Sequence, residues 1–431
     1  MLRINNFLSQ NYNLFLGLLG AVLVFRKPGT IGLIVVIAIS VICYRNINLN
    51  TKKIKLIALV ALPLLLDILF FWNNEAFLDG FKHLEKRVSL LLLPLIIVGF
   101  FKKIQLLKIL KVYTLFFILI LDFLLIKFLW SEPVLVQKYL KGIHLWEMGY
   151  KFANSTTVHA PALNMHVAFA AAAVTFILTS LRKGIPKIHI AIWLVLLINI
   201  LGLLLLINTR LAMVLGVFGV FLVLVCQLLG RVSLKRLGLI TGSAAVVMLV
   251  MFLAFAKAFP YVYEKFSKVT FAHMDKVNQL DDFENPEGEV FNSFVTRVSI
   301  WNTALDRAKD DLWLGVGAAD GKDELNQAYI DTGQQFLARW KFPTHNQYID
   351  FLLKFGVLGL VGTIIFMLNI AYMGFELKNS LILFFFILFA ASNLTDDFLI
   401  RYDGITFSAL WISIFSNLFY YSRRGNDLPS T

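Results

Sequence analysis

Long runs of apolar residues restrict the fold of this chain more than any other feature of its sequence. Five such runs lie at 54–72, 114–130, 188–207, 211–229 and 237–256. Each approaches the roughly 20 residues that a helix needs to cross about 30 Å of hydrocarbon. Within a bilayer, only helices and closed barrels satisfy every backbone polar group, and these runs lack the polar–apolar alternation of barrel strands. We therefore expect an all-α, polytopic membrane protein.

The composition agrees with this class of protein. Hydrophobic residues make up 58% of the 431 residues and charged residues only 16%, whereas about a quarter of a soluble domain is charged. The net charge of +13 fits Lys and Arg in cytoplasmic loops better than it fits nucleic-acid binding, so no nucleic-acid partner is expected. Cys43 and Cys226 fall inside apolar runs without a ligand-spaced His or Cys, which predicts small buried side chains.

The hydropathy pattern predicts about twelve membrane crossings, within a range of eleven to thirteen. They lie near 12–25, 30–44, 54–72, 88–101, 107–130, 162–181, 187–207, 211–229, 237–257, 347–373, 379–393 and 405–421. If the N-terminus is cytoplasmic, the inside loops are rich in Lys and Arg, and most acids fall in the opposite loops. This is the positive-inside pattern, so both termini are expected in the cytoplasm.

The predicted topology leaves one large hydrophilic segment on the outer face. It divides the chain into helices 1–9 over 1–257, an outer loop over 258–346, and helices 10–12 with a cytoplasmic tail over 347–431. Apolar residues at helical spacing predict an amphipathic helix from Phe291 to Asp311. A Leu-Gly-Val-Gly turn at 314–317 is interpreted as the stop signal of that helix.

Two arginines and one histidine are the main candidate site residues. Arg210 stands between two apolar runs, where an arginine is costly unless it has a function or extends to the headgroups. Arg297 lies on the amphipathic helix, where a surface salt bridge is the alternative and Arg307 could substitute for it. His345 directly precedes an apolar helix at the membrane surface. Spacing alone predicts only an anion site on the outer face.

The chemistry of these residue types suits a phosphate-linked substrate. Arginine binds phosphate oxygens in bidentate fashion and keeps its charge. A neutral histidine can take the proton of an attacking hydroxyl, a step worth roughly 10²–10⁴-fold in rate. The early outer loops contain no Asp-x-Asp motif, whose carboxylates would hold a divalent cation on phosphates.

Further polar residues near the predicted outer surface are candidates for supporting roles. His159 and His166 flank Pro161 at the sixth crossing, with interfacial hydrogen bonding as the simpler explanation. The last outer loop contains candidates to orient the histidine or the acceptor, although such a loop needs polar residues in any case; they are Asp396, Asp397, Arg401 and Asp403. Lys82, Lys86 and Arg87 precede the fourth crossing and are expected to extend to lipid headgroups.

The motifs around the candidate residues resemble the O-antigen ligase and polymerase superfamily. They are Asn-Thr-Arg at 208–210, Arg-Val-Ser-Ile-Trp at 297–301, the turn at 314–317, His-Asn-Gln-Tyr at 345–348 and Gly-Val-Leu-Gly-Leu at 356–360. The first departs from many relatives, which have Ser before the arginine and Gly after it.

This resemblance implies a metal-independent glycosyltransferase without a cofactor, in the inner membrane of a bacterium and with a periplasmic site. The donor would be an undecaprenyl-pyrophosphate-linked glycan, and the acceptor of a ligase would be a sugar of the lipid A–core. By position, Arg210 and Arg297 would hold the donor pyrophosphate and His345 would activate the acceptor. Asn346 and Trp301 lie inside the same motifs and are possible supporting residues.

Other functions remain open at this point. A polymerase that joins glycan repeat units would use the same donor, with another lipid-linked glycan as acceptor. A transporter or flippase would need ionisable residues at midplane and an internal repeat; charge within the runs is sparse, with Asp67 and Asp122 as the main cases. A purely structural membrane protein is the most distant alternative.

Overall fold

The computed structural model describes residues 7–42, 47–100, 102–141, 145–181, 184–258, 270–291 and 293–426. The predicted all-α class is confirmed, because the described residues form helices and no sheet. Cys43 lies outside the described residues. Cys226 is exposed on α13 (Arg210–Leu228) and not buried as predicted. Its helix also exposes Val214 and Phe218, and a side chain that faces lipid needs no burial within the protein.

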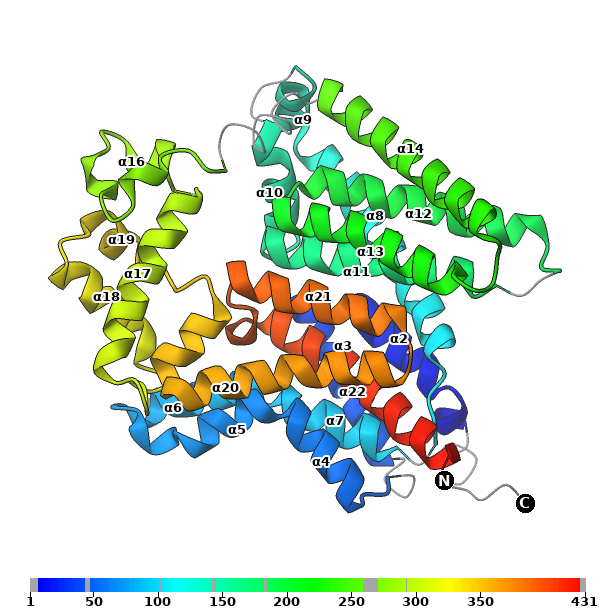
Figure 1. The fold of residues 1–431 in the computed structure, drawn as a ribbon, viewed down its shortest axis with the longest axis horizontal. Helices are drawn as coiled ribbons and strands as arrows, with labels where there is room; N and C mark the ends of the chain where they lie inside the picture. The colour runs from blue at the N-terminus through cyan, green and yellow to red at the C-terminus, as the bar shows by residue number, and fades with distance from the viewer. Residues whose placement is uncertain are drawn as a thin grey trace.

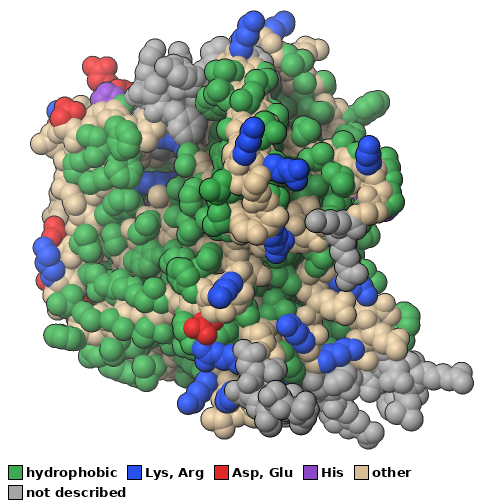
Figure 2. Space-filling view, turned by 45° about the vertical axis from the view of Figure 1, so that its right-hand side comes forward, with side chains coloured by type: hydrophobic (Ala, Val, Ile, Leu, Met, Phe, Trp, Pro, Cys, Tyr) green, Lys and Arg blue, Asp and Glu red, His purple; other side chains and the backbone are tan. Residues whose placement is uncertain are grey.

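Among the described residues, six helices are long and apolar enough to cross a membrane. They are α8 (Leu106–Ser131), α11 (Ala160–Thr179), α12 (Lys187–Ile207), α13, α14 (Leu234–Ala258) and α20 (Gln347–Glu376). Shorter helices complete the bundle, namely α2 (Tyr12–Val22), α3 (Arg26–Ile42), α4 (Thr51–Val60), α5 (Leu62–Leu69), α7 (Ser89–Gly99), α21 (Ser380–Thr395) and α22 (Tyr402–Asn426). Apolar side chains cover much of the face shown in Figure 2. The total of twelve crossings stays a prediction.

The predicted crossing over 54–72 is not one helix. It divides into α4 and α5 at Ala61, where the backbone leaves the helical region (φ −81°, ψ 0°). Pro63 follows at the start of α5. Proline lacks the N–H that would continue the hydrogen-bond ladder of α4 and is well tolerated in the first turn of a helix. The proline therefore turns one apolar run into two short helices.

A small subdomain with its own core lies between α14 and α20. It contains η4 (Met274–Lys276), η5 (Leu280–Asp282), α16 (Pro286–Glu289), α17 (Phe294–Asp310), α18 (Gly321–Asp331) and α19 (Gln335–Trp340). Its buried residues include Ile300, Tyr329 and Phe336. The amphipathic helix predicted over 291–311 corresponds to α17. Figure 1 shows this subdomain at one end of the bundle and the end of α22 at the other.

The remaining helices are short and surround the subdomain end of the bundle. They are η2 (Phe71–Asn73), α6 (Phe77–Arg87), α9 (Pro133–Leu140), α10 (Leu145–Ser155) and η6 (Phe398–Ile400). Figure 1 shows α6 and α10 on opposite sides of this end, with α20 and α21 between them. At this end of the bundle, His345 precedes α20, Asp396 follows α21 and Arg297 lies on α17.

Helix α20 is broken at Gly356, whose backbone adopts φ 63° and ψ −156°. The break frees two carbonyl groups, and the turn at 314–317 satisfies them. Val316 N–H donates to the Leu353 carbonyl and Gly317 N–H to the Lys354 carbonyl, each at 3.0 Å. The Val357 N–H in turn donates to the Leu312 carbonyl at 2.8 Å. The Leu-Gly-Val-Gly turn therefore docks the subdomain on the broken helix, a role that its sequence did not indicate.

Replacing Gly356 by Ala should destabilise the protein. Only glycine occupies this backbone region readily, and strain there costs about 1–3 kcal/mol. A Cβ at this position would also lie 2.3 Å from the backbone of Trp313. We expect a lower thermal unfolding midpoint in detergent. Gly202→Ala in α12 is the matched control, because a Cβ there meets nothing within 4 Å; equal midpoints for the two variants would contradict the prediction.

Candidate functional site

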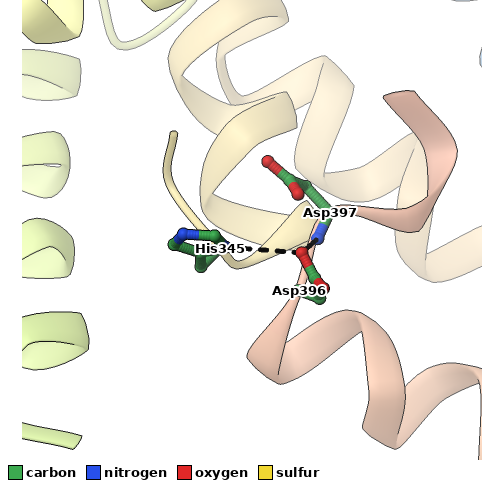
Figure 3. Close-up of side chains that lie close together, drawn as sticks. All are labelled: His345, Asp396 and Asp397. Carbon is green, nitrogen blue, oxygen red and sulfur yellow. Dashed lines mark hydrogen bonds and ion pairs between the residues drawn. The ribbon is translucent and has the colours of Figure 1, made fainter. Parts of the chain in front are cut away.

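His345 and Asp396 face each other at the subdomain end of the bundle (Figure 3). His345 precedes α20, Asp396 follows α21, and the His345 Nδ1 and Asp396 Oδ1 atoms are 3.4 Å apart. The His345 side chain is 19% exposed and that of Asp396 is 3% exposed. The imidazole can therefore still meet a substrate, whereas the carboxylate is covered and can act only through its neighbours.

The backbone around His345 is fixed by two residues of the predicted motifs. Trp301 on α17 donates its Nε1–H to the Thr344 carbonyl at 3.0 Å. Asn346 caps α20 by accepting the N–H groups of Tyr348 and Ile349 at 3.0 and 3.3 Å. His345 itself takes the left-handed conformation, with φ 47°, which is uncommon outside glycine. Trp301 and Asn346 thus contact the loop that presents the imidazole.

The Asp396 carboxylate is surrounded by positively charged or ionisable groups. Arg401 Nη2 lies 3.2 Å from Asp396 Oδ1 and 3.4 Å from Asp397 Oδ1. His159 Nδ1, from the residue that precedes α11, lies 3.5 Å from Asp396 Oδ2. Two of the predicted supporting residues, His159 and Asp396, are therefore in contact, and Asp396 also contacts His345.

The two neighbouring carboxyl groups differ in acidity. Burial alone would raise the pKa of Asp396, but the hydrogen bond to His345 and the charge of Arg401 hold it well below its usual range. Burial and the adjacent Asp396 charge raise the pKa of Asp397 well above its usual range. Asp396 is therefore the group of the pair that holds the negative charge more readily.

His345 is neutral at pH 7. Burial lowers its pKa below 6.5, and the charges of Arg297 and Arg401 act in the same direction, whereas Asp396 opposes them. Burial likewise lowers the pKa of His159 to about 4. With the Nδ1 atom of His345 directed at a carboxylate, the Nε2 atom is left to accept a proton.

Arg297 joins this group from α17. Its Nη1 donates to the carbonyl of Thr395, the residue before Asp396. Arg210 begins α13, and its Nη1 donates to the Thr270 hydroxyl at 2.9 Å. Arg297 therefore lies beside the His345–Asp396 pair. Arg210 lies beside Thr270, the first described residue of the segment that leads into the subdomain.

The turn that presents Arg210 is held from two sides. Asn208 ends α12 in the left-handed conformation, with φ 57°, which asparagine tolerates better than most residues. Thr209 accepts a hydrogen bond from Asn164 Nδ2 of α11 at 2.8 Å. The two spans α12 and α13 are thus joined by a rigid two-residue turn, with Arg210 at the first helical position after it.

Tyr150 on α10 links the two arginines and was not singled out from the sequence. Burial raises the pKa of its phenol, and the charges of Arg297 and Arg210 oppose that rise while Asp396 adds to it. The phenol is therefore within electrostatic reach of all three groups. A lone tyrosine in a short mixed segment carries no sequence signal for such a position.

Residues 194–364 match the family model described as O-antigen ligase. This match supports a relationship of the domain at residues 194–364 to the O-antigen ligase superfamily. The match covers less than half of the chain and contains Arg210, Arg297 and His345. A search of curated proteins finds no match to the chain. The match supports an O-antigen ligase- or polymerase-like role in processing glycans at a membrane.

Two of the residues considered in the sequence analysis lie away from His345. His166 is buried two turns inside α11, where its ring centroid lies 4.0 Å from that of Phe407, so it packs in the aromatic core of the bundle. Arg307 forms ion pairs with Glu324 and Asp311, both at 2.8 Å. It therefore stabilises the subdomain and does not substitute for Arg297.

One group of side chains has the composition of a metal site. Ligand atoms of His345, Asp396 and Asp397 lie within 4.8 Å of one another. The Arg401 guanidinium already bridges both carboxyl groups, and the raised pKa of Asp397 makes it a poorer anionic ligand. Divalent cations such as Mg²⁺ and Ca²⁺ need more oxygen ligands than this, so the donor set does not favour a metal.

Behind the site, a buried set of contacts that we call the clamp was not predicted from the sequence. Leu399 N–H donates to Gln347 Oε1 at 2.7 Å, and the Leu399 carbonyl accepts Arg87 Nε–H at 2.9 Å. Arg87 pairs with Asp67, and each side chain is only 1% exposed. The expectation that Arg87 extends to headgroups is therefore wrong, because it has a buried carboxylate and a buried carbonyl as partners. The clamp fixes the loop that carries Asp396.

Proposed function

We propose that this protein transfers a glycan from undecaprenyl pyrophosphate to a sugar hydroxyl of lipid A–core, at the periplasmic face of the bacterial inner membrane. The observation that carries the proposal is a neutral His345, oriented by Asp396, directly beside the guanidinium of Arg297. In this proposal the 258–346 loop is periplasmic, both termini are cytoplasmic, and the two helical segments 1–257 and 347–431 enclose the site.

The reaction needs one proton acceptor and one stabilised leaving group. His345 Nε2 takes the proton of the acceptor hydroxyl as its oxygen forms a bond to the anomeric carbon of the glycan. The bond from that carbon to the pyrophosphate oxygen breaks, and undecaprenyl pyrophosphate leaves. Arg210 and Arg297 stabilise the charge that collects on the pyrophosphate, which is usually the larger contribution to catalysis. Asp396 holds the imidazole and stabilises its protonated form.

An apolar groove beside Arg210 supports a lipid-linked donor. The groove has a volume of about 440 Å³ and lies between α12, α13 and α14, where Leu204, Met213, Val217, Met248 and Phe252 are among its lining residues. Met213 and Val214 follow Arg210 by one helical turn. A polyprenyl chain in this groove would place its pyrophosphate at Arg210. One lipid-linked donor would then occupy the apolar groove and pair with the arginine.

Reconstitution tests the proposal directly. Purified protein in proteoliposomes should be given an undecaprenyl-pyrophosphate glycan, with or without lipid A–core, and products followed by mass spectrometry. We expect a glycan-modified core, at the same rate with and without EDTA. A lengthened lipid-linked glycan in the absence of core would identify a polymerase instead. Intact donor under both conditions would end the proposal.

The transfer rate should depend on pH through His345. Because burial and nearby arginines lower its pKa, the rate should be constant near pH 7 and fall only below 6.5, where the imidazole becomes protonated. Asp396 raises this pKa, so Asp396→Asn should move the acidic limb to lower pH while reducing the maximum rate. Rate profiles from about pH 4 to 8 test both statements. An acidic limb that moves upward in this variant would contradict the assignment.

A further inference from the structure

Two segments at the subdomain end of the bundle expose large apolar side chains. In the connection between α17 and α18, Leu312, Trp313 and Leu314 are 40%, 71% and 48% exposed. In η2 and α6, the exposed residues include Trp72, Phe77, Leu78 and Phe81. We call these seven residues the aromatic patch. Isolated exposed apolar residues are common, but a group of this size usually marks an interaction surface.

Polar contacts hold the two segments together behind the patch. Asn73 Nδ2 donates to the Gly315 carbonyl at 2.9 Å. Asn74 Oδ1 accepts the Ala319 N–H at 2.8 Å, and Glu75 N–H donates to Asp320 Oδ2 at 3.0 Å. The polar groups of these segments thus bond one another while the apolar side chains point outward. These hydrogen bonds therefore fix the two segments that carry the patch relative to each other.

The patch is continuous with the side of α20 that faces outward from the bundle. The backbone of Trp313 packs against Gly356, at the point where the straight part of α20 begins. From there Leu358, Val361, Ile365 and Leu368 are all exposed along the helix. In a helix long and apolar enough to span a membrane, such a face contacts lipid. The patch begins where that lipid-facing side ends.

We infer that the aromatic patch binds the outer surface of the lipid bilayer and anchors the α16–α19 subdomain to it. Tryptophan is enriched at the boundary between headgroups and acyl chains, and α6 adds the exposed cations Lys82 and Lys86 next to its aromatic residues. Docked in this way, the α17–α18 connection would hold α17, and with it Arg297, at a fixed height above the membrane. The inference requires α20 to span the membrane but not that the protein transfers glycans.

Fluorescence quenching by brominated lipids tests this surface. Wild-type protein, Trp313→Phe and Trp340→Phe are reconstituted in vesicles whose phospholipids carry bromine close to the headgroup or deep in the acyl chain. Trp340 is the control, because it is also exposed (48%) but lies on α19 at the far edge of the subdomain (Figure 1). Phenylalanine retains an apolar ring in both variants, so folding is expected to be preserved.

Removing Trp313 should abolish a component of the fluorescence that shallow bromine quenches more strongly than deep bromine. Removing Trp340 should instead abolish a component that aqueous iodide quenches. If iodide quenches Trp313 and brominated lipid does not, the patch faces water and the inference is wrong. If neither quencher affects Trp313, another protein surface covers the patch, and the lipid surface is equally excluded. Neither result depends on transfer activity.

Discussion

Replacing His345 by Asn should abolish glycan transfer and leave the protein folded in the membrane. Asparagine tolerates the left-handed backbone of this position, where φ is 47°, and its amide can still bond to Asp396. It cannot accept a proton from an acceptor hydroxyl. Loss of a general base costs roughly 10²–10⁴-fold in rate, so product should fall to the detection limit of the reconstituted assay while the thermal unfolding midpoint changes little.

His273→Asn is the matched control for this substitution. His273 is also left-handed, with φ 60°, and is exposed on the segment that leads to η4. It should keep the wild-type rate, which separates the loss of the site histidine from any effect of exchanging a histidine in a strained loop. If the His345 variant transferred glycan at the wild-type rate, His345 would not be the general base.

Replacing Arg210 by Lys should reduce transfer by about 10²-fold or more, the usual cost of losing one group that stabilises developing charge. Lysine keeps the positive charge but offers a compact ammonium in place of a planar fork, so it cannot hold a pyrophosphate in bidentate fashion. The loss should be mainly in kcat, because the charge on the pyrophosphate grows as it leaves. Steady-state kinetics at varied donor concentration distinguish a lower kcat from weaker donor binding, which would raise KM alone.

Arg307→Lys provides the comparison for the arginine substitution. Arg307 lies on α17, as Arg297 does, but pairs with Glu324 and Asp311 in the subdomain. The partly exposed ion pairs of this kind contribute at most about 1 kcal/mol to stability, so transfer should stay near the wild-type rate. Unchanged activity in Arg210→Lys would show that a bidentate clamp is not required at that position.

The helical class and most helix positions could be predicted from the sequence because lipid imposes long apolar runs on the chain. The predicted crossings over 187–207 and 211–229 coincide almost completely with α12 and α13. Predictions failed where tertiary contacts compensate for a broken helix. Nothing near Gly356 shows that carbonyls freed there would be satisfied by N–H groups forty residues earlier in the chain.

For the site, local motifs indicated the residues, but distances between segments could not be predicted. His345, Arg297 and Arg210 lie in recognisable patterns, whereas their meeting with Asp396 depends on how α17, α20 and α21 pack. His166 was considered because it follows Pro161 closely in sequence. Two helical turns are enough to take its side chain into the aromatic core. Arg87 and Leu399 are separated by 312 positions, so no local pattern could pair them.

The clamp on Leu399 has a consequence for how the protein is assembled during synthesis. Asp67 and Arg87 emerge early in translation and become buried together, but the carbonyl that accepts the Arg87 Nε–H belongs to a hairpin made near the end. A nascent chain that stops before this hairpin leaves a guanidinium N–H in the interior without an acceptor, which is costly in a low-dielectric setting. We therefore expect the packing of the first helices to be completed only when the last hairpin inserts beside them.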